Sequence, residues 1–424
     1  MHKQLRLTQV FIITLMAFSL LWSASLPTAK PEQAGLSSER LQRLTQAMQG
    51  YVDQGRAVGL VTLVVRNNHI VYHQAFGKID LIRHTPMPLN GIFRIASQTK
   101  AVTSTAIMML QEEGKLLIDD PVAKYIPEFA NARVAVQAEG KEVQGYATVP
   151  LKRAITVRDL LTHTAGISYG SGPARGDWAA AGLNTWFLAD KDLFIGDVIK
   201  KLATLPFDAQ PGEKFIYGYN TDILGYVVER ASGMSLAEFI EKKITRPLQM
   251  TDSHFFLPQE KIDRFTSVYG LDDKGALFLK EDGRDNFYVK GPRKCYAGGA
   301  GLLSTAEDYA RFLTMLLNGG ELQGTRLLSP KTVELMTANH VGDLYGSQGF
   351  SLGFWVTDRL GRNGQPGSVG AFGWGGAYHT VYWVDPAEKM VCVLMTQLLP
   401  AGNSDLHAKF RAMVYQAIVT SYER

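Results

Sequence analysis

The chain has 424 residues, of which 46% are apolar and 20% are charged, and its formal net charge is +4. This balance excludes a disordered, collagen-like or coiled-coil protein. The small charge excess, without a basic run, gives no sign of a nucleic-acid partner. Two cysteines cannot form a disulfide framework, and the nine histidines lack metal-ligand spacing. We therefore expect no metal and no cofactor, and Cys295 and Cys392 fit two buried thiols better than a bridge.

Residues 1–25 are typical of a signal peptide. Lys3 and Arg6 precede a mostly apolar run at residues 10–22, and small residues suitable for cleavage follow. The run is shorter than the roughly 20 residues that a membrane-spanning helix needs. We therefore predict export to the periplasm or the extracellular space, and no membrane span after the signal is removed.

The first half of the mature chain combines helical and β-type patterns. Ser37 or Ser38 can cap an amphipathic helix. Its apolar face consists of Leu41, Leu44, Met48 and Tyr51. Residues 60–65 and 70–74 predict a hairpin, and residues 101–113 predict a helix. A polar stretch at about 133–152 indicates an inserted hairpin or excursion.

Helical patterns dominate from about residue 157 to 247, and a capping box at Ser304 predicts another helix through residue 317. Two β-type runs and a terminal helix are expected at residues 380–384, 390–395 and 405–421. Strands at both ends with helices between them favour an α+β fold, in which both ends of the chain build one antiparallel sheet flanked by helices.

We expect one catalytic domain over residues 26–424. Its sheet part would comprise about 26–96 and 290–424, and a mostly helical lobe would comprise about 97–289.

The strongest local chemical signal is Ser97-Gln98-Thr99-Lys100, at the start of a helical run. Residues three apart lie on one helix face, so the lysine can help to deprotonate the serine. Alone the motif is weak, because a capping serine followed by a solvated lysine has the same spacing.

Further segments give the motif a context. They are residues 93–100, 160–166, Pro211-Gly212 ahead of Tyr217, 298–302 and 373–376. In this order they resemble the serine β-lactamase and penicillin-binding-protein superfamily, and most closely its class C β-lactamase branch. The resemblance implies a β-lactamase/transpeptidase-like fold.

The resemblance also implies residue roles. Ser97 would be the nucleophile that becomes acylated, and Lys100 would share its proton. Tyr217 would act as general base in its tyrosinate form beside the lysine charge, with Tyr219 as the competing candidate. Trp374-Gly375-Gly376 stands where β-lactamases have Lys-Thr-Gly. This segment would border the substrate, and the N–H groups of Ser97 and Ala377 would form the oxyanion hole.

Two departures from the family pattern bear on the substrate. The second motif is normally Tyr-x-Asn, but here it ends in Tyr219, and Asn220 comes one place late. In the third motif Trp374 replaces the lysine, so anionic substrates lose a charged partner worth roughly 1.5–3 kcal/mol. These features resemble the family VIII carboxylesterases and imply a small-molecule ester as the substrate.

Three alternatives stay open at this point. Ser168, in Gly-Ile-Ser-Tyr-Gly, fits the nucleophile-elbow pattern of α/β-hydrolases, although turn-forming residues flank it. The same fold could serve a D,D-peptidase or β-lactamase that acts on peptidoglycan-like or β-lactam amides. A binding protein without catalytic activity would be expected to have lost a catalytic residue, and none is lost here.

Overall fold

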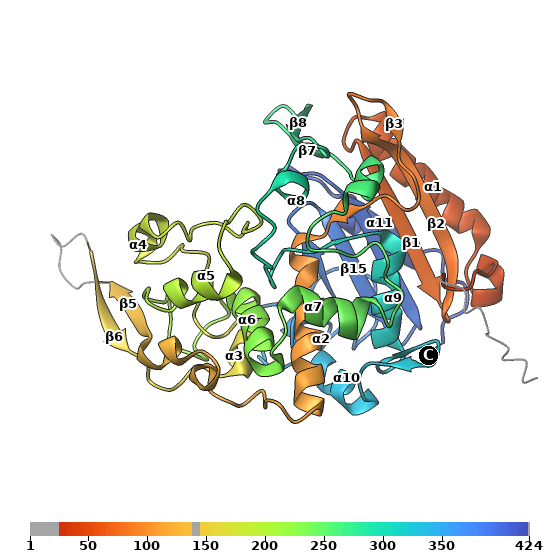
Figure 1. Cartoon of the computed structure of the whole chain (residues 1–424). Coiled ribbons are helices and arrows are strands. Elements are labelled where there is room, and N and C mark those ends of the chain that lie inside the picture. The colour runs from red at the N-terminus through yellow and green to blue at the C-terminus, as the bar shows by residue number, and fades with distance from the viewer. Residues whose placement is uncertain (1–24, 138–144, 423–424) are drawn as a thin grey trace, which may run out of the picture.

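An antiparallel sheet of eight strands forms one side of the protein in the computed structural model, which describes residues 25–137 and 145–422 (Figure 1). The predicted signal peptide lies outside the described residues, apart from Ser25. In spatial order the strands are β12 (Gly349–Phe350), β13 (Trp355–Val356), β14 (Phe372–Gly376), β15 (Thr380–Asp385), β16 (Met390–Thr396), β1 (Gly59–Arg66), β2 (His69–Asp80) and β3 (Thr85–Pro86). N-terminal β1 pairs with C-terminal β16, so both ends of the chain build the sheet and the predicted fold class is confirmed.

The β1–β2 hairpin turns at Asn67 and Asn68, whose φ angles are 49° and 64°. Two successive residues with positive φ give a turn whose twist matches that of the strands, and asparagine tolerates this conformation well. The predicted hairpin is thereby confirmed.

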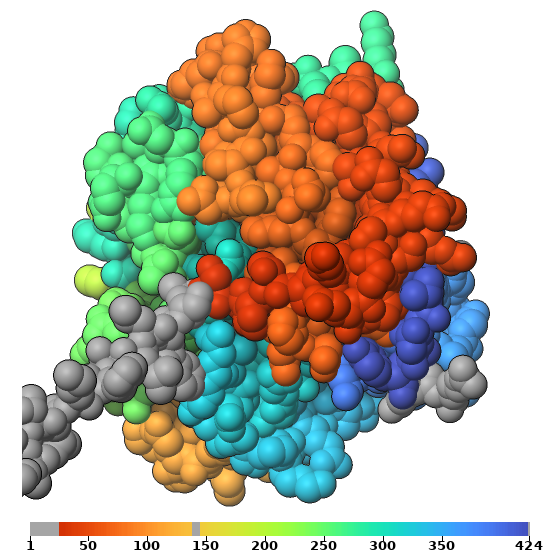
Figure 2. Space-filling model, turned by 90° about the vertical axis from the view of Figure 1, so that its right-hand side faces the viewer, coloured from red at the N-terminus to blue at the C-terminus, as the bar shows by residue number. Residues whose placement is uncertain are grey.

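Two helices from opposite ends of the chain cover one face of the sheet. They are α1 (Ser38–Asp53) and α11 (Leu406–Tyr415), and they pack on each other. Ser37 caps α1, and the predicted apolar face of this helix is the face that is buried. Figure 2 shows the red N-terminal and blue C-terminal segments side by side. The terminal helix ends earlier than predicted, because Ala417 and Ile418 pair with the backbone of residues 36 and 37.

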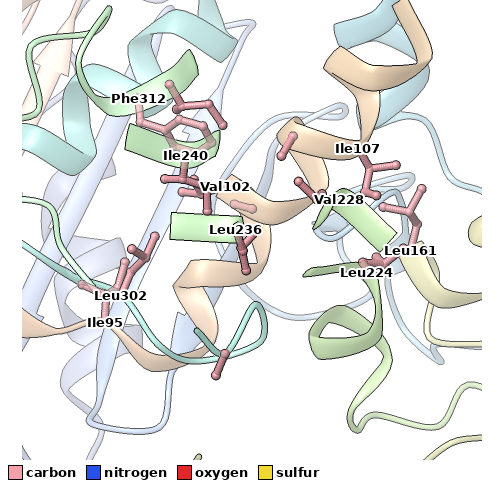
Figure 3. Close-up of a cluster of buried hydrophobic side chains, with 14 of the residues drawn as sticks. Ile95, Val102, Ile107, Leu161, Leu224, Val228, Leu236, Ile240, Leu302 and Phe312 are labelled. Atoms are coloured by element: carbon pink, nitrogen blue, oxygen red, sulfur yellow. The ribbon is translucent and has the colours of Figure 1, made fainter. Parts of the chain in front are cut away.

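The other face of the sheet packs against α9 (Ala306–Leu317), and α2 (Thr99–Glu112) lies between the sheet part and the helical lobe. Every residue of α2 from Thr99 to Leu110 is buried. Figure 3 shows side chains of this interior, with Val102 of α2 near Leu236 and Ile240, and Ile107 near Val228.

The remaining elements complete the lobe and its connections. The helices are α3 (Val157–Leu161), α4 (Arg175–Ala180), α5 (Ile195–Leu202), α6 (Asn220–Ser232), α7 (Leu236–Ile240), α8 (Phe287–Lys290) and α10 (Pro330–Thr337), with the π-helical turn η5 (Glu241–Thr245) after α7. The short strand pairs are β4 (Phe93–Arg94) with β9 (Leu303–Ser304), β5 (Arg133–Gln137) with β6 (Tyr146–Pro150), β7 (Val268–Leu271) with β8 (Leu277–Glu281), and β10 (Glu321–Leu322) with β11 (Thr325–Arg326).

Some local predictions are refined. The polar stretch at 133–152 contains the β5–β6 hairpin. The cap of α9 is Thr305 rather than Ser304, because Ser304 is used in β9, where it pairs with Phe93. Both cysteines are buried free thiols, as expected. No helix in the described residues is long and apolar enough to span a membrane.

Candidate active site

A cavity of about 460 Å³ brings together most of the residues that the sequence singled out. Ser97 and Tyr217 line it, and so do Trp374, Gly375, Gly376 and Ala377. Lys100 lies directly behind Ser97, whereas Tyr219 does not line the cavity. Most of the remaining wall is aromatic or apolar: Tyr169, Trp186, Tyr345, Trp355, Val381 and His407.

Ser97 is presented by a short 3₁₀ turn, Ala96–Gln98, that leads directly into α2. Both neighbours of Ser97 are fully buried, while Ser97 itself is partly exposed to the cavity. Ala96 has a φ of 42°, a conformation that L-residues other than Gly, Asn and Asp adopt rarely. Tertiary contacts hold the turn, since Ile95 N–H donates to Leu302 O at 3.1 Å. The backbone strain therefore lies directly before the candidate nucleophile.

The Lys100 side chain is buried and uses its ammonium group to join three partners. Nζ donates to the Gly299 carbonyl at 2.7 Å, and to Ser97 Oγ and Tyr169 OH at 3.3 Å each. It also lies 4.6 Å from the centroid of the Tyr217 ring. Three acceptors match the three donors of an ammonium group, which offsets the cost of burying the charge.

Asp222 binds the N–H group of Gly299, whose carbonyl group binds Lys100. Asp222 Oδ1 accepts the Gly299 N–H at 2.9 Å. Burial raises the pKa of Asp222 to about 6, and the Lys100 charge opposes this rise. Gly299 therefore binds the Asp222 carboxylate through its N–H group and the Lys100 ammonium through its carbonyl group. A Cβ at position 299 would lie 2.5 Å from Asp222 Oδ2, so this approach requires glycine.

Tyr217 is placed by a close crossing of two segments. A Cβ on Gly218 would lie 2.3 Å from the Ser168 carbonyl carbon, so only glycine lets the chain pass here. The hydroxyl oxygen of Tyr217 accepts a hydrogen bond from Trp374 Nε1 at 3.1 Å, and the two ring centroids are 5.4 Å apart. The residue that replaces the family's lysine thus contacts the candidate base directly.

The Trp374–Gly376 segment has a free edge. β13 pairs with β14 only at Phe372 and Gly373, so among the described strands residues 374–376 pair with β15 alone. A Cβ on Gly376 would lie 2.4 Å from Ile95 O, next to the turn that carries Ser97. This close approach brings the end of β14 beside the serine.

Tyr219 and Asn220 serve structural roles instead. Tyr219 is fully buried, donates its hydroxyl to Thr185 O, and stacks on Trp178. Asn220 is also fully buried, and its Nδ2 donates to the Ile167 carbonyl at 3.1 Å. Placing Tyr219 among the substrate-binding residues is therefore not supported, because its ring points away from the cavity into the lobe.

The alternative nucleophile, Ser168, lies in a turn. Its Oγ accepts the N–H groups of Gly170 at 3.0 Å and Ser171 at 3.1 Å, and the residue is buried. Neither a strand before it nor a helix directly after it is present, so the nucleophile-elbow geometry is absent from this described segment.

Several site residues were missed by the sequence reasoning. Tyr169 stands directly after the Ser168 decoy, and its hydroxyl contacts Lys100. Burial, with Tyr217 and Asp222 nearby, raises its pKa well above the usual value, so this hydroxyl keeps its proton. The only available signal was its position three residues after the Gly166 that ends the His-Thr-Ala-Gly motif.

His379 is a further residue near the site that the sequence analysis did not single out. It lies in the turn after β14, with a φ of 65°, and its ring stacks on His407 at a centroid distance of 3.9 Å. His407 in turn lines the cavity. The stacking partner comes from near the C-terminus, which local sequence patterns do not reveal.

Comparison with known proteins identifies the family of the chain. The model of the beta-lactamase family matches residues 44–416. Esterase EstB of Burkholderia gladioli is 29% identical over 386 residues, which cover 85% of this chain and 91% of the esterase. A putative D-alanyl-D-alanine carboxypeptidase of Escherichia coli K12 is 30% identical over 417 residues, or 91% of this chain and 89% of that protein.

Among solved structures, EstCE1 superimposes with a TM-score of 0.74 and 25% identity, covering 91% of this chain and 99% of that one. It is described as a hydrolase with promiscuous acyltransferase activity.

Proposed function

This chain belongs to the beta-lactamase family of serine hydrolases, and from that premise we propose that it cleaves carboxylic esters through an acyl-enzyme on Ser97. The observation that carries the proposal is the set of contacts around one aromatic cavity. Lys100 donates to Ser97, and Trp374 donates to the hydroxyl oxygen of Tyr217. The similarity to an esterase over most of both chains supports the same activity.

In the proposed acylation step, Ser97 Oγ attacks the ester carbonyl carbon. Its proton passes to the Tyr217 oxygen, with Lys100 holding the two groups together by its charge, and then to the departing alcohol. The N–H groups of Ser97 and Ala377 stabilise the oxyanion that develops, and one such donor is typically worth about 10²–10³ in rate. Water then attacks the acyl-enzyme by the reverse proton path and releases the acid.

The cavity wall favours a neutral substrate. The described residues that line it include no Lys, Arg, Asp or Glu, and the charge of Lys100 is used by groups behind Ser97. Large aromatic surfaces bind apolar groups well, whereas an anionic group would lose its hydration without gaining a cation. An ester with an apolar acyl or alcohol part meets these conditions.

The second candidate is a D,D-peptidase or β-lactamase activity on peptidoglycan-like or β-lactam amides. The relative named as a putative D-alanyl-D-alanine carboxypeptidase favours it. The absence of a lysine in the third motif disfavours it, since Trp374 offers no charge to a substrate carboxylate.

The first test combines labelling with a substrate panel. Intact mass after treatment with a fluorophosphonate should show one adduct on wild type and on Ser168→Ala, and none on Ser97→Ala. Hydrolysis of p-nitrophenyl butyrate should exceed the Ser97→Ala background, while nitrocefin hydrolysis and D-alanine release stay slow. Fast nitrocefin hydrolysis or D-alanine release would favour the second candidate, and a folded wild type without an adduct would refute both.

We also propose that the protein is exported, on the basis of the signal-like pattern in residues 1–25. Expression of the full chain in a bacterial host, followed by cell fractionation and N-terminal sequencing, tests this. A periplasmic or secreted product that begins near residue 26 is expected, and an uncleaved cytoplasmic product would contradict it.

A further inference from the structure

A second cavity, of about 620 Å³, lies away from Ser97 and is larger than the active-site cavity. It is formed by α7, η5, residues 249–256 and the segment from Arg293 to Leu302. The two cavities share no lining residue. Its volume falls within the range of roughly 300–1,000 Å³ that is typical of small-molecule sites.

The inner wall of this cavity is apolar. Ile240, Met250, Phe255, Phe256 and Leu302 are all buried and line it. In Figure 3 Ile240 lies near Phe312 and Val102, and Leu302 lies near Ile95, so both side chains also belong to the packed core. Such a wall favours the hydrocarbon or aromatic body of a ligand.

Two polar side chains that line the cavity, Ser253 and His254, already have partners within the protein. Ser253 Oγ is bonded to Ser304 and Asp308, and His254 Nε2 lies 2.9 Å from Lys261 Nζ. Burial and the Lys261 charge lower the pKa of His254 to about 4, so its ring is neutral near pH 7. These two side chains therefore do not need a polar group from the ligand.

The charged side chains stand at the exposed mouth. Arg246 is ion-paired with Glu241 at 2.7 Å, which balances one positive charge by a negative one. Arg293 has no carboxylate partner among the described residues. Its guanidinium donates to the buried Leu257 carbonyl at 3.2 Å and lies 5.7 Å from the Phe256 ring centroid, so it is held over the opening.

We propose that this cavity is a second ligand site, which binds a monocarboxylate with an aliphatic or aromatic body. The carboxylate pairs with the Arg293 guanidinium at the mouth, and the apolar body enters the cavity. A guanidinium fork matches a carboxylate in a bidentate manner, and one uncompensated cation fits one negative charge. The site does not depend on chemistry at Ser97.

Isothermal titration calorimetry with sodium octanoate tests the proposal on the full folded protein. Wild type should bind octanoate saturably and more tightly than 1-octanol. Arg293→Gln should weaken octanoate binding by about 10- to 100-fold, because hydrogen bonds to a charged group are lost. Arg284→Gln is the matched control, since Arg284 is an exposed arginine paired with Asp263 and does not line the cavity.

Two further variants separate the cavities and guard against misfolding of Arg293→Gln. Ala237→Phe fills the second cavity from α7 and should abolish octanoate binding, whereas Trp186→Ala alters only the active-site cavity and should leave it within about twofold. The proposal is overturned if octanoate does not saturate, if 1-octanol binds as tightly, or if Trp186→Ala removes binding while Ala237→Phe preserves it.

Discussion

Replacing Trp374 with Phe tests whether the third motif acts on the candidate base. The substitution keeps an aromatic ring in the cavity wall but removes the indole N–H that donates to Tyr217 at 3.1 Å. Because indole nitrogen is only a donor, the Tyr217 oxygen must be the acceptor in this bond. The bond therefore stabilises Tyr217 more strongly in its anionic form than in its neutral form.

The size of the effect distinguishes the two forms of Tyr217. A hydrogen bond between neutral groups contributes about 0.5–1.5 kcal/mol, and one to a charged group about 1.5–3 kcal/mol. If Tyr217 stays neutral, the bond is the same in the free enzyme and the transition state, and its loss leaves kcat/KM unchanged. If Tyr217 must ionise, the difference between the charged and the neutral bond, about 1–1.5 kcal/mol, is lost, which at 1.36 kcal/mol per factor of ten is about 5- to 12-fold in kcat/KM. We expect this loss if Tyr217 accepts the Ser97 proton as tyrosinate.

The assay is hydrolysis of p-nitrophenyl butyrate, with Trp186→Phe as the matched control. Trp186 lines the same cavity, and its indole nitrogen makes no hydrogen bond to the described residues. The control therefore measures the loss of ring area alone. Thermal unfolding of both variants checks that the fold is intact. Equal losses in Trp374→Phe and Trp186→Phe would refute the argument that this hydrogen bond acts on the base.

Three further predictions concern groups around the serine. Gly299→Ala should lower the melting temperature and kcat, because the new methyl group overlaps Asp222, and such overpacking typically costs about 1–3 kcal/mol. The control Gly176→Ala, at a helical position in open space, should lower neither in thermal-unfolding and ester assays. Asp222→Asn should gain stability relative to wild type as pH rises from about 4 to 6, because a pKa near 6 in the folded state makes ionisation of Asp222 cost about 3 kcal/mol. Denaturant titrations of both proteins across this range measure the difference in their free energies of unfolding, and a difference that does not change with pH would contradict the prediction. Ser168→Ala should keep most ester turnover while losing about 1 kcal/mol of stability in urea unfolding, because its hydroxyl caps a turn and bonds to Asp208 and does not line the cavity.

Local sequence patterns predict the parts of the fold that depend on residues close together in the chain. The helical spacing from Leu41 to Tyr51 gave the buried face of α1, since burial there follows the helix period. Ser97 and Lys100 share one turn, so their contact followed from spacing. Tyr217 and Trp374 lie far apart in the chain, and their shared cavity was expected only through the family resemblance.

Contacts between distant segments could not be derived in this way. The link from Asp222 through Gly299 to Lys100 joins three separate segments, and nothing local to any of them indicates it. Tyr219 was a plausible site residue by position, but the direction of its ring depends on Trp178, which belongs to another helix of the lobe. Side-chain direction at a helix start is a tertiary property, so sequence spacing alone does not determine whether Tyr219 faces the cavity.

The charge arrangement around the serine bears on how the reaction ends. Lys100 and Asp222 both bind the backbone of Gly299, and neither lines the cavity, so both charges are held behind the serine. The proposed ester hydrolysis would leave a carboxylate in this cavity, where it would meet the indole of Trp374 instead of a lysine. Because a carboxylate without a cationic partner is more stable in water than against an aromatic wall, the wall disfavours retention of the acid product. The same substitution that weakens binding of anionic substrates thus favours product release from an esterase.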